Sequence, residues 1–432
     1  MTTLRAANRR AYSWIVLLLM FLAIGSVLVR NSVAWPATSW MFIYSPGDFA
    51  TTRDLITFLE ELRAPIPPAI SAAEIIDFQL TGTTDVVTNY LYKATLVGAY
   101  LLALWLTYPS LSRLILSFVT SIIFLWATTL VHPLNPQVYD AFLPFFILMS
   151  LALLRVVTSV PPGKSGVAYV VCGFAGFFLS MAELARPFML AVLPILLVGA
   201  YLRLRGAVQR LFAVLLVPLA LFSGVWHAHL ITAHHQLLST NHSGFNLLRA
   251  WRETPIRLNA LVPEAHRNPV AKDRWPNLNT AEHYVNSQVL ERDVLTYILT
   301  NPGQALPHAV AQIVHFISAP TSTYAGTSHE RTVPYHPVLG VYRVVAPASF
   351  LFMLANVVVL AVYTIKAGAR FHLVLAFPEN LLLIVAFLSL LVLSLGEANE
   401  EARLVISMLP LLAAFPVASA VRISPNTRRD IH

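Results

Sequence analysis

Charged residues are scarce in this chain of 432 residues, at 12%. An ordinary soluble domain carries about 25%. Apolar residues make up 57% and the mean hydropathy is +0.66, which excludes a soluble globular enzyme. A disordered chain is excluded too, because it would be polar and rich in charge. The single cysteine, Cys172, excludes a disulfide framework and a cysteine metal cage. It lies in an apolar run, where we expect a small buried residue.

Long apolar runs occupy most of the sequence. A helix needs about 20 residues to cross the hydrocarbon core of a bilayer. Ten runs approach this length, so we predict an all-α polytopic membrane protein of ten transmembrane helices. The first run resembles a signal peptide, but its length and the lack of a small-residue cleavage site predict a retained anchor. The runs are residues 12–29, 93–108, 114–131, 141–157, 167–184, 187–202, 208–230, 347–366, 378–395 and 404–421.

Basic residues gather in alternate connections between these runs, which indicates their orientation because cytoplasmic loops are rich in Lys and Arg. If the N-terminus is cytoplasmic, the short external turns hold only Arg186 and Arg403. Both termini are therefore predicted to be cytoplasmic, and the net charge of +8 reports insertion rather than a nucleic-acid partner. The basic residues of the cytoplasmic segments are Arg113, Arg155, Lys164, Arg203, Arg205, Arg210, Lys366, Arg370, Arg422, Arg428 and Arg429.

This topology predicts three parts. Residues 1–230 form an N-terminal transmembrane module with an external loop at 30–92, residues 231–346 form an external region, and residues 347–432 form a C-terminal transmembrane module with a short tail. Helical spacing in both external segments predicts amphipathic helices that lie on the membrane surface or pack against the bundle. These stretches are 55–62, 294–299 and 305–317. A phosphate-binding G-x-x-x-x-G-K-[ST] loop is absent from the sequence, which argues against an ATP-driven pump.

Nearly all carboxylates fall on the predicted external face, so we look for chemistry there. Asp48 follows a Pro-Gly turn after the first span and could act as a general base. It could equally cap the helix that follows, and the pattern alone slightly favours the cap. Asp140 and His132 border the turn between the third and fourth spans. There too, capping by Asp140 is the simpler interpretation of the pattern.

Two external turns pair acidic residues with arginine. Glu183 and Arg186 stand three residues apart, so Arg186 either binds a phosphate through its guanidinium fork or pairs locally with Glu183. Glu401 and Arg403 lie in a turn with further carboxylates at the start of the tenth span. There Arg403 is either a second phosphate ligand or an interfacial side chain that reaches toward water.

A third cluster contains His234, His235 and His242 and raises the question of a zinc site. No acidic residue stands beside them and no H-E-x-x-H pattern is present in the sequence, so we predict no metal site there. Asn241 opens an N-glycosylation sequon, Asn241-His242-Ser243, which is a short and common pattern.

Together these segments resemble the membrane glycosyltransferases of the GT-C fold. The branch they resemble is that of protein O-mannosyltransferases and bacterial lipid-linked-sugar transferases, of the glycosyltransferase family 39 type. The resemblance runs from about residue 12 to residue 421. It is carried by Gly47-Asp48-Phe49 with the helix after it, the stretch from Leu184-Ala185-Arg186-Pro187 to Leu193-Pro194, the segment Ser239 to Leu247, the segment Arg292 to Gly303, and Glu401-Ala402-Arg403-Leu404 with Leu409-Pro410.

The resemblance implies a polyprenyl-phosphate-linked sugar as donor and a glycan, lipid or protein acceptor at the external membrane face. It implies inversion at the anomeric carbon, with Asp48 as the base and Asp54 or Asp140 as second carboxylates. Arg186 and Arg403 would stabilise the leaving phosphate, an electrostatic role. The remaining substrate-binding candidates are Glu183, Glu401, His132, Asn241 and Asn246.

Family members often carry adjacent acidic residues in the first loop, whereas Gly47 and Phe49 flank Asp48 here. A divalent metal is therefore compatible with the family but unsupported by this sequence, and we expect no required cofactor. We expect membrane lipid as a partner and no nucleic acid. The expected location is a bacterial inner membrane, with the active face periplasmic or extracellular.

Three other functions are compatible with these sequence features. A flippase or transporter of lipid-linked sugar could use the same charges, although transporters place their sites near the midplane of the membrane. An inactive accessory protein of the same fold would account for the missing paired acid. A polymer ligase would use a lipid-linked glycan but transfer whole chains.

The predicted orientation can be tested with a reporter fused after His432. We expect it to be active in the cytoplasm, since the basic connections favour that side. A periplasmic or luminal signal would reverse every assignment of face.

Overall fold

The computed structural model describes residues 86–107, 118–126, 139–158, 165–186, 189–204, 208–234, 243–251, 254–259, 281–318, 337–367, 378–396 and 409–411, with isolated positions elsewhere. Within these ranges every regular element is a helix, and no strand occurs. The all-helical class predicted from the sequence is therefore found throughout the described part of the chain.

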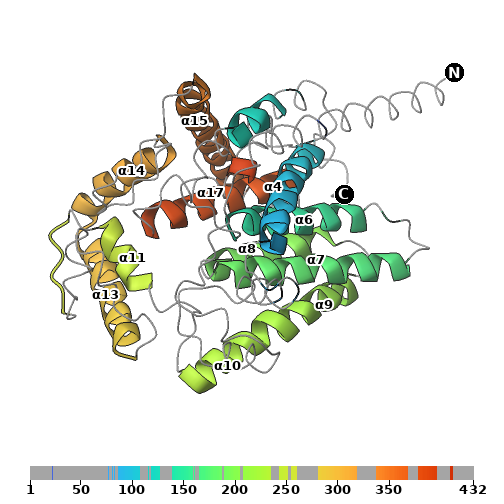
Figure 1. Ribbon diagram of the computed structural model, residues 1–432, viewed down its shortest axis with the longest axis horizontal. Coiled ribbons are helices and arrows are strands. Elements are labelled where there is room, and N and C mark those ends of the chain that lie inside the picture. Colours follow the sequence, from blue (N-terminus) through green and yellow to red (C-terminus); the bar gives the residue numbers. More distant parts are fainter. Residues whose placement is uncertain are drawn as a thin grey trace.

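Four helices form the centre of the molecule. α4 (Val86–Thr107) packs on α6 (Tyr139–Val157), α6 packs on α7 (Ser165–Ala185), and α7 packs on α9 (Val208–Leu219). Figure 1 shows α7 and α9 side by side across the middle. Their facing side chains are mostly Leu, Ala and Phe and form one continuous buried core.

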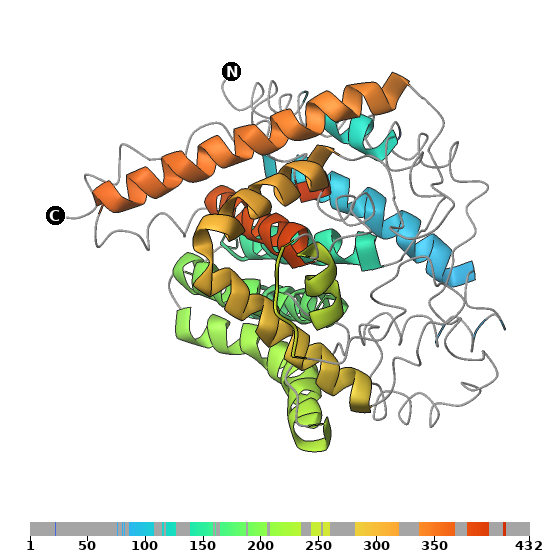
Figure 2. The same cartoon turned by 90° about the vertical axis from the view of Figure 1, so that its left-hand side faces the viewer.

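α8 (Met189–Arg203), α15 (Pro337–Ala367) and α17 (Pro378–Gly396) add to this core. α8 packs on α17, and α17 also contacts α15. In Figure 2, α15 extends along one side of the molecule. Its outward side chains Val344, Leu351, Val358 and Ile365 recur at seven-residue steps and are between 54% and 80% exposed. An apolar stripe of this length is suited to contact with lipid rather than water.

The described residues of the external region predicted at 231–346 include the helices α11 (Ser243–Ala250), α13 (Ala281–Thr300) and α14 (Pro302–Ser318). α11 packs on α13, and α14 contacts α13, α15 and α17. They enclose a separate small core around Trp251 and Tyr297. We call α11, α13 and α14 the outer lobe, and Figure 1 shows it at one side of the central helices. The amphipathic stretches predicted at 294–299 and 305–317 are confirmed as parts of α13 and α14.

One continuous helix changes its winding in the middle. α9 leads into a π-helical turn, η4 (Ala220–Gly224), and then into α10 (Val225–His234). The backbone N–H of Val225 bonds to the carbonyl of Ala220, five residues earlier. Pro218 precedes this turn and has no N–H to donate, and its ring crowds the carbonyl four residues before it. π turns of this kind occur at irregular points in long helices.

Among the described residues, three helices are long and apolar enough to cross a membrane: Gly166–Ala185, Gln209–Thr232 and Gly340–Val362. Shorter apolar helices in the same ranges, Lys93–Leu106, Phe142–Val157, Met189–Leu202 and Asn380–Leu395, match further predicted spans. Seven of the ten predicted runs thus coincide with these helices; the third run is helical over residues 118–126, and most of the first and tenth runs lies outside the described residues. The number of spans and their orientation remain predictions.

Several helix starts differ from the sequence prediction. α4 begins at Val86 instead of 93, so the helix extends through the more polar residues before the apolar run. α15 begins at Pro337 instead of 347, because the stretch before Pro347 is apolar and the missing N–H of one proline does not end the helix. α8 begins at Met189 instead of 187, since Arg186 occupies a tight turn in which its carbonyl accepts the N–H of Met189 at 2.9 Å.

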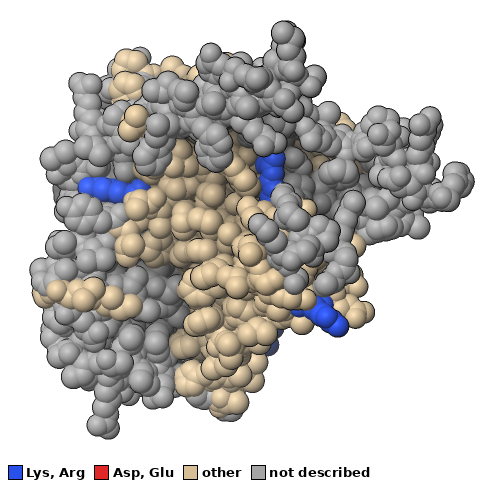
Figure 3. Space-filling view, turned by 90° about the vertical axis from the view of Figure 1, so that its right-hand side faces the viewer, with Lys and Arg blue, Asp and Glu red and all other residues tan. Residues whose placement is uncertain are grey.

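Arg155, in the last turn of α6, joins the ends of two helices. Its Nη1 donates to the carbonyls of Trp105 (3.3 Å) and Leu106 (3.0 Å) at the end of α4, and the guanidinium lies 4.9 Å from the Trp105 ring centroid. A cation here satisfies carbonyls that the helix leaves open. Figure 3 views the molecule from the side on which α9 begins in Figure 1; Lys and Arg are visible among its described residues and Asp and Glu are not.

α7 and α9 approach so closely that glycine is required between them. A Cβ at Gly176 would collide with the backbone carbonyl of Leu215, whereas a Cβ at Gly173 would meet only a Val214 methyl at 3.7 Å. Small residues at such contacts allow membrane helices to pack tightly.

We therefore expect Gly176→Ala to destabilise the protein by about 1–3 kcal/mol, because the obstructing atom is backbone and cannot rotate away. Gly173→Ala is the matched control on the same helix and should leave stability unchanged or slightly raised. The thermal unfolding midpoint of the detergent-solubilised protein measures both. Equal midpoints for the two variants would contradict the close approach.

Candidate functional site

A short row of polar side chains crosses the otherwise apolar contact between α7 and the α9–η4–α10 helix. The hydroxyls of Ser180 and Ser223 are 2.7 Å apart and hydrogen-bonded. One turn further along, Nε2 of His227 lies 2.8 Å from Oε1 of Glu183. We call these four residues the polar seam. All four are buried.

The spacing along each helix explains why the seam forms. Ser180 and Glu183 are three residues apart on α7 and therefore share a face. Ser223 and His227 are four residues apart and share a face of the partner helix. The π turn lies between Pro218 and His227, and one extra residue in a turn rotates everything after it by about 100°. This rotation sets which face of α10 meets α7.

Glu183 is the most buried charged side chain in the described part of the chain, at 2% exposure. Oε1 is held by His227, while Oε2 is buried and has no hydrogen-bond partner among the described residues. Ionisable groups at membrane depth are expensive and are retained mainly for function. A buried carboxylate oxygen that can still accept a hydrogen bond is therefore suited to a ligand.

Arg186 stands directly after the last residue of α7 and is 6% exposed. Its backbone N–H bonds to the carbonyls of Ala182 (3.3 Å) and Glu183 (3.1 Å), so it closes the end of the helix. A cation is favoured there because the C-terminal end of a helix is partly negative. The local pairing of Arg186 with Glu183 was one interpretation of the sequence; the structure gives Glu183 a different partner, His227.

The structure thus places two of the predicted site residues, Glu183 and Arg186, one turn apart at the same helix end. Asp140 is the second residue of α6, so its backbone lies in the first turn of that helix. Asn246 lies on α11 in the outer lobe and is partly buried. The other predicted residues lie outside the described part of the chain: Asp48, Asp54, His132, Asn241, Glu401 and Arg403.

Sequence reasoning missed His227. The available signal was a histidine inside the predicted seventh span, 208–230, where any ionisable residue is a candidate for function. Within the described ranges, no group of three His, Cys, Asp or Glu side chains is arranged to hold a metal ion.

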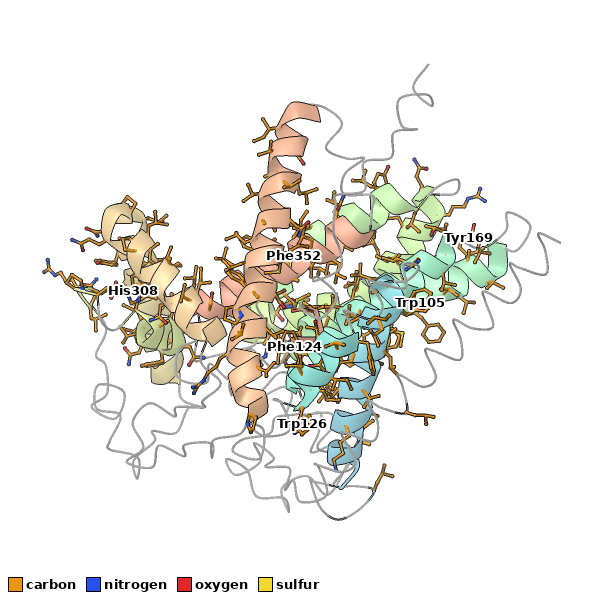
Figure 4. The ribbon with its side chains drawn as sticks, turned by 90° about the horizontal axis from the view of Figure 1, so that it is seen from above. Trp105, Phe124, Trp126, Tyr169, His308 and Phe352 are labelled. Atoms are coloured by element: carbon orange, nitrogen blue, oxygen red, sulfur yellow. The ribbon has the colours of Figure 1, made fainter. Side chains whose placement is uncertain are left out.

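A second polar cluster ties the outer lobe to the central helices. Nε1 of Trp251 donates to the carbonyl of Leu395 in the last turn of α17, at 3.1 Å. His308 and Gln312 of α14 both bond to the carbonyl of Ala250, at 2.9 and 3.0 Å, and the His308 ring lies on Trp251 with centroids 4.8 Å apart. Figure 4 shows His308 at one end of the molecule, with Trp105 and Tyr169 toward the other. The lobe is therefore anchored at the end of α17.

No protein-family model matches this chain, and no curated protein matches it. Two solved structures of ArnT from Cupriavidus metallidurans are similar to it, one in the apo state and one bound to undecaprenyl phosphate. Their sequence identities are 11% and 12%, the matches cover 90% and 94% of this chain and 78% of each ArnT chain, and both TM-scores are 0.36. A likeness at this level assigns no function.

The anchor at Trp251 can be tested with Trp251→Phe, which keeps an aromatic ring beside His308 but removes the donor to Leu395. We expect a loss of about 1 kcal/mol in stability, the usual net value of one hydrogen bond. Trp226→Phe is the matched control, because Nε1 of Trp226 has no hydrogen-bond partner among the described residues. The thermal midpoint and the rate of proteolysis within the outer lobe report the change. A midpoint for Trp251→Phe no lower than that of Trp226→Phe would mean that the bond does not anchor the lobe.

Proposed function

We propose that this chain is a GT-C-like membrane glycosyltransferase that transfers a sugar from a polyprenyl-phosphate donor to an acceptor at the external membrane face. The observation that carries the proposal is the buried group at the end of α7: Arg186, with Glu183 one turn before it and His227 bonded to Glu183. An apolar helix bundle can pack without ionisable side chains. Burying them in a membrane costs free energy, so their presence here supports a ligand-binding role.

The position of this group supports a lipid-phosphate substrate. In the predicted topology, α7 ends at the external surface, the depth at which the phosphate of a membrane-anchored donor lies. A guanidinium binds a phosphate through two parallel hydrogen bonds and keeps its charge under all conditions. Arg186 would hold the donor phosphate and stabilise the negative charge that grows on it as the sugar departs.

The reaction then needs a base for the acceptor. Asp48 would take the proton of the acceptor hydroxyl while that oxygen attacks the anomeric carbon, with inversion. The bond from the anomeric carbon to the phosphate oxygen breaks, and polyprenyl phosphate leaves. Asp54 or Asp140 would serve as a second carboxylate, Arg403 as a second phosphate ligand, and Glu401, His132, Asn241 and Asn246 as contacts to the sugar.

The proposal predicts release of labelled polyprenyl phosphate when purified protein receives polyprenyl-phosphate sugars and an acceptor fraction. We expect Asp48→Asn to lower the transfer rate by about 10²- to 10⁴-fold, the value of one general base. We expect Arg186→Gln to lower it by roughly 10²-fold or more, since it removes a charge-stabilising donor. Asp430→Asn in the predicted cytoplasmic tail and Arg210→Gln at the exposed start of α9 are matched controls and should retain full activity.

Different results would point elsewhere. Full activity of Asp48→Asn would exclude Asp48 as the base. Absence of transfer with every donor, together with movement of lipid-linked sugar across vesicles, would favour the flippase. Release of a lipid carrier from whole glycan chains only would favour the polymer ligase.

A further inference from the structure

We infer that Glu183 binds a hydroxyl of the donor sugar through Oε2, and that His227 is the positioning residue that holds Glu183 in the orientation required. This inference deepens the proposed function and rests on it. It names a sugar contact beside the phosphate contact assigned to Arg186.

The first step concerns the two oxygens of Glu183. An ionised carboxylate only accepts hydrogen bonds, with two oxygens that each need donors when buried. Oε1 receives one from Nε2 of His227 at 2.8 Å, while Oε2 is buried without a partner among the described residues. A buried acceptor left without a donor costs free energy, so its persistence indicates a donor that arrives with the ligand. The hydroxyls of a sugar are such donors.

The second step concerns the part played by His227. If the contact only held α10 against α7, the Ser180–Ser223 pair one turn away would serve without burying a charge. Hydrogen bonds between membrane helices add only modest stability. What the His227 contact adds is direction: it fixes Oε1 and so determines where Oε2 points. His227 itself touches no substrate in this scheme and acts through Glu183.

The third step is the neighbourhood. Arg186 follows Glu183 by three residues and is also buried, so the carboxylate and the guanidinium lie at one end of α7. A sugar joined to a phosphate presents hydroxyls within a few ångströms of that phosphate. Glu183 and Arg186 can therefore contact the two halves of one sugar phosphate, whereas a polyprenyl phosphate without sugar would contact Arg186 alone.

Two substitutions of His227, by amide side chains of different length, test the inference. The amide nitrogen of His227→Gln reaches about as far as Nε2 and can donate to Oε1, while that of His227→Asn is one methylene shorter and falls short of it. The readout is the ratio of two dissociation constants in detergent, for bare polyprenyl phosphate and for polyprenyl-phosphate glucose. His229→Asn, two residues along α10, controls for a change of composition in that helix.

We expect wild type, His227→Gln and His229→Asn to bind the sugar-bearing lipid more tightly than the bare lipid. In His227→Asn this preference should fall by about 10- to 100-fold, the effect of a misplaced contact, with bare-lipid binding unchanged. Glu183→Gln should lose a similar part of the preference. The double variant His227→Asn with Glu183→Gln should lose no more of the preference than Glu183→Gln alone, because in this scheme His227 acts through that carboxylate.

Three results would overturn the inference: equal preferences in His227→Gln and His227→Asn, a preference that survives Glu183→Gln, or additive losses in the double variant. A lower thermal midpoint of His227→Asn with an unchanged ratio would show a purely structural bond and would also overturn it. The proposed function fails separately, when wild type binds the sugar lipid with the expected preference but transfers no sugar to any acceptor. The binding ratio decides the inference in either case.

Discussion

Water is absent from the hydrocarbon core of a bilayer, so a charged side chain in an apolar helix must find its partner within the protein. This constraint explains the contact between α7 and α10. Glu183 lies near the end of an apolar helix with 2% of its surface exposed, and His227 supplies the donor that makes this burial tolerable. The rest of the helix pair is arranged around that requirement, from the glycine that allows close approach to the π turn that orients the histidine.

The close approach and the winding change act together. At Gly176 the two helices come near enough that a methyl group would collide with the backbone of Leu215. Cys172 lies one turn earlier on the same face and its thiol contacts the carbonyl of Leu211 at 3.1 Å. Further along the pair, the π turn of Ala220–Gly224 includes Ser223, the first seam residue of its helix. The turn therefore precedes His227 and sets the face of α10 on which that histidine lies.

Much of the helical layout could be predicted because its cause is local. α6 and α7 match the predicted runs closely, since apolar stretches bounded by proline and charge define their own ends. The start of α15 was missed because Arg343 and Pro347 look like a boundary, yet neither breaks a helix whose flanks are apolar on all sides. The hydrogen bond between Glu183 and His227 joins residues 44 positions apart, and nothing in the spacing of either helix identifies the other. A π turn adds one residue to a turn, a change that hydrophobic periodicity does not register.

In the proposed transferase, the two polar clusters would serve different parts of the reaction. The seam belongs to helices fixed to one another by backbone contact, so a phosphate bound beside it would be held still while charge develops. The outer lobe has its own small core around Trp251 and meets the central helices through α11 and α14, with one hydrogen bond from Nε1 of Trp251 to the carbonyl of Leu395. A bond of this kind costs little to break and reform compared with the apolar core of the bundle. An acceptor must enter and a glycosylated product must leave, whereas the donor lipid stays in the membrane. A rigid donor side and an outer lobe with a separate small core are the arrangement that this asymmetry favours.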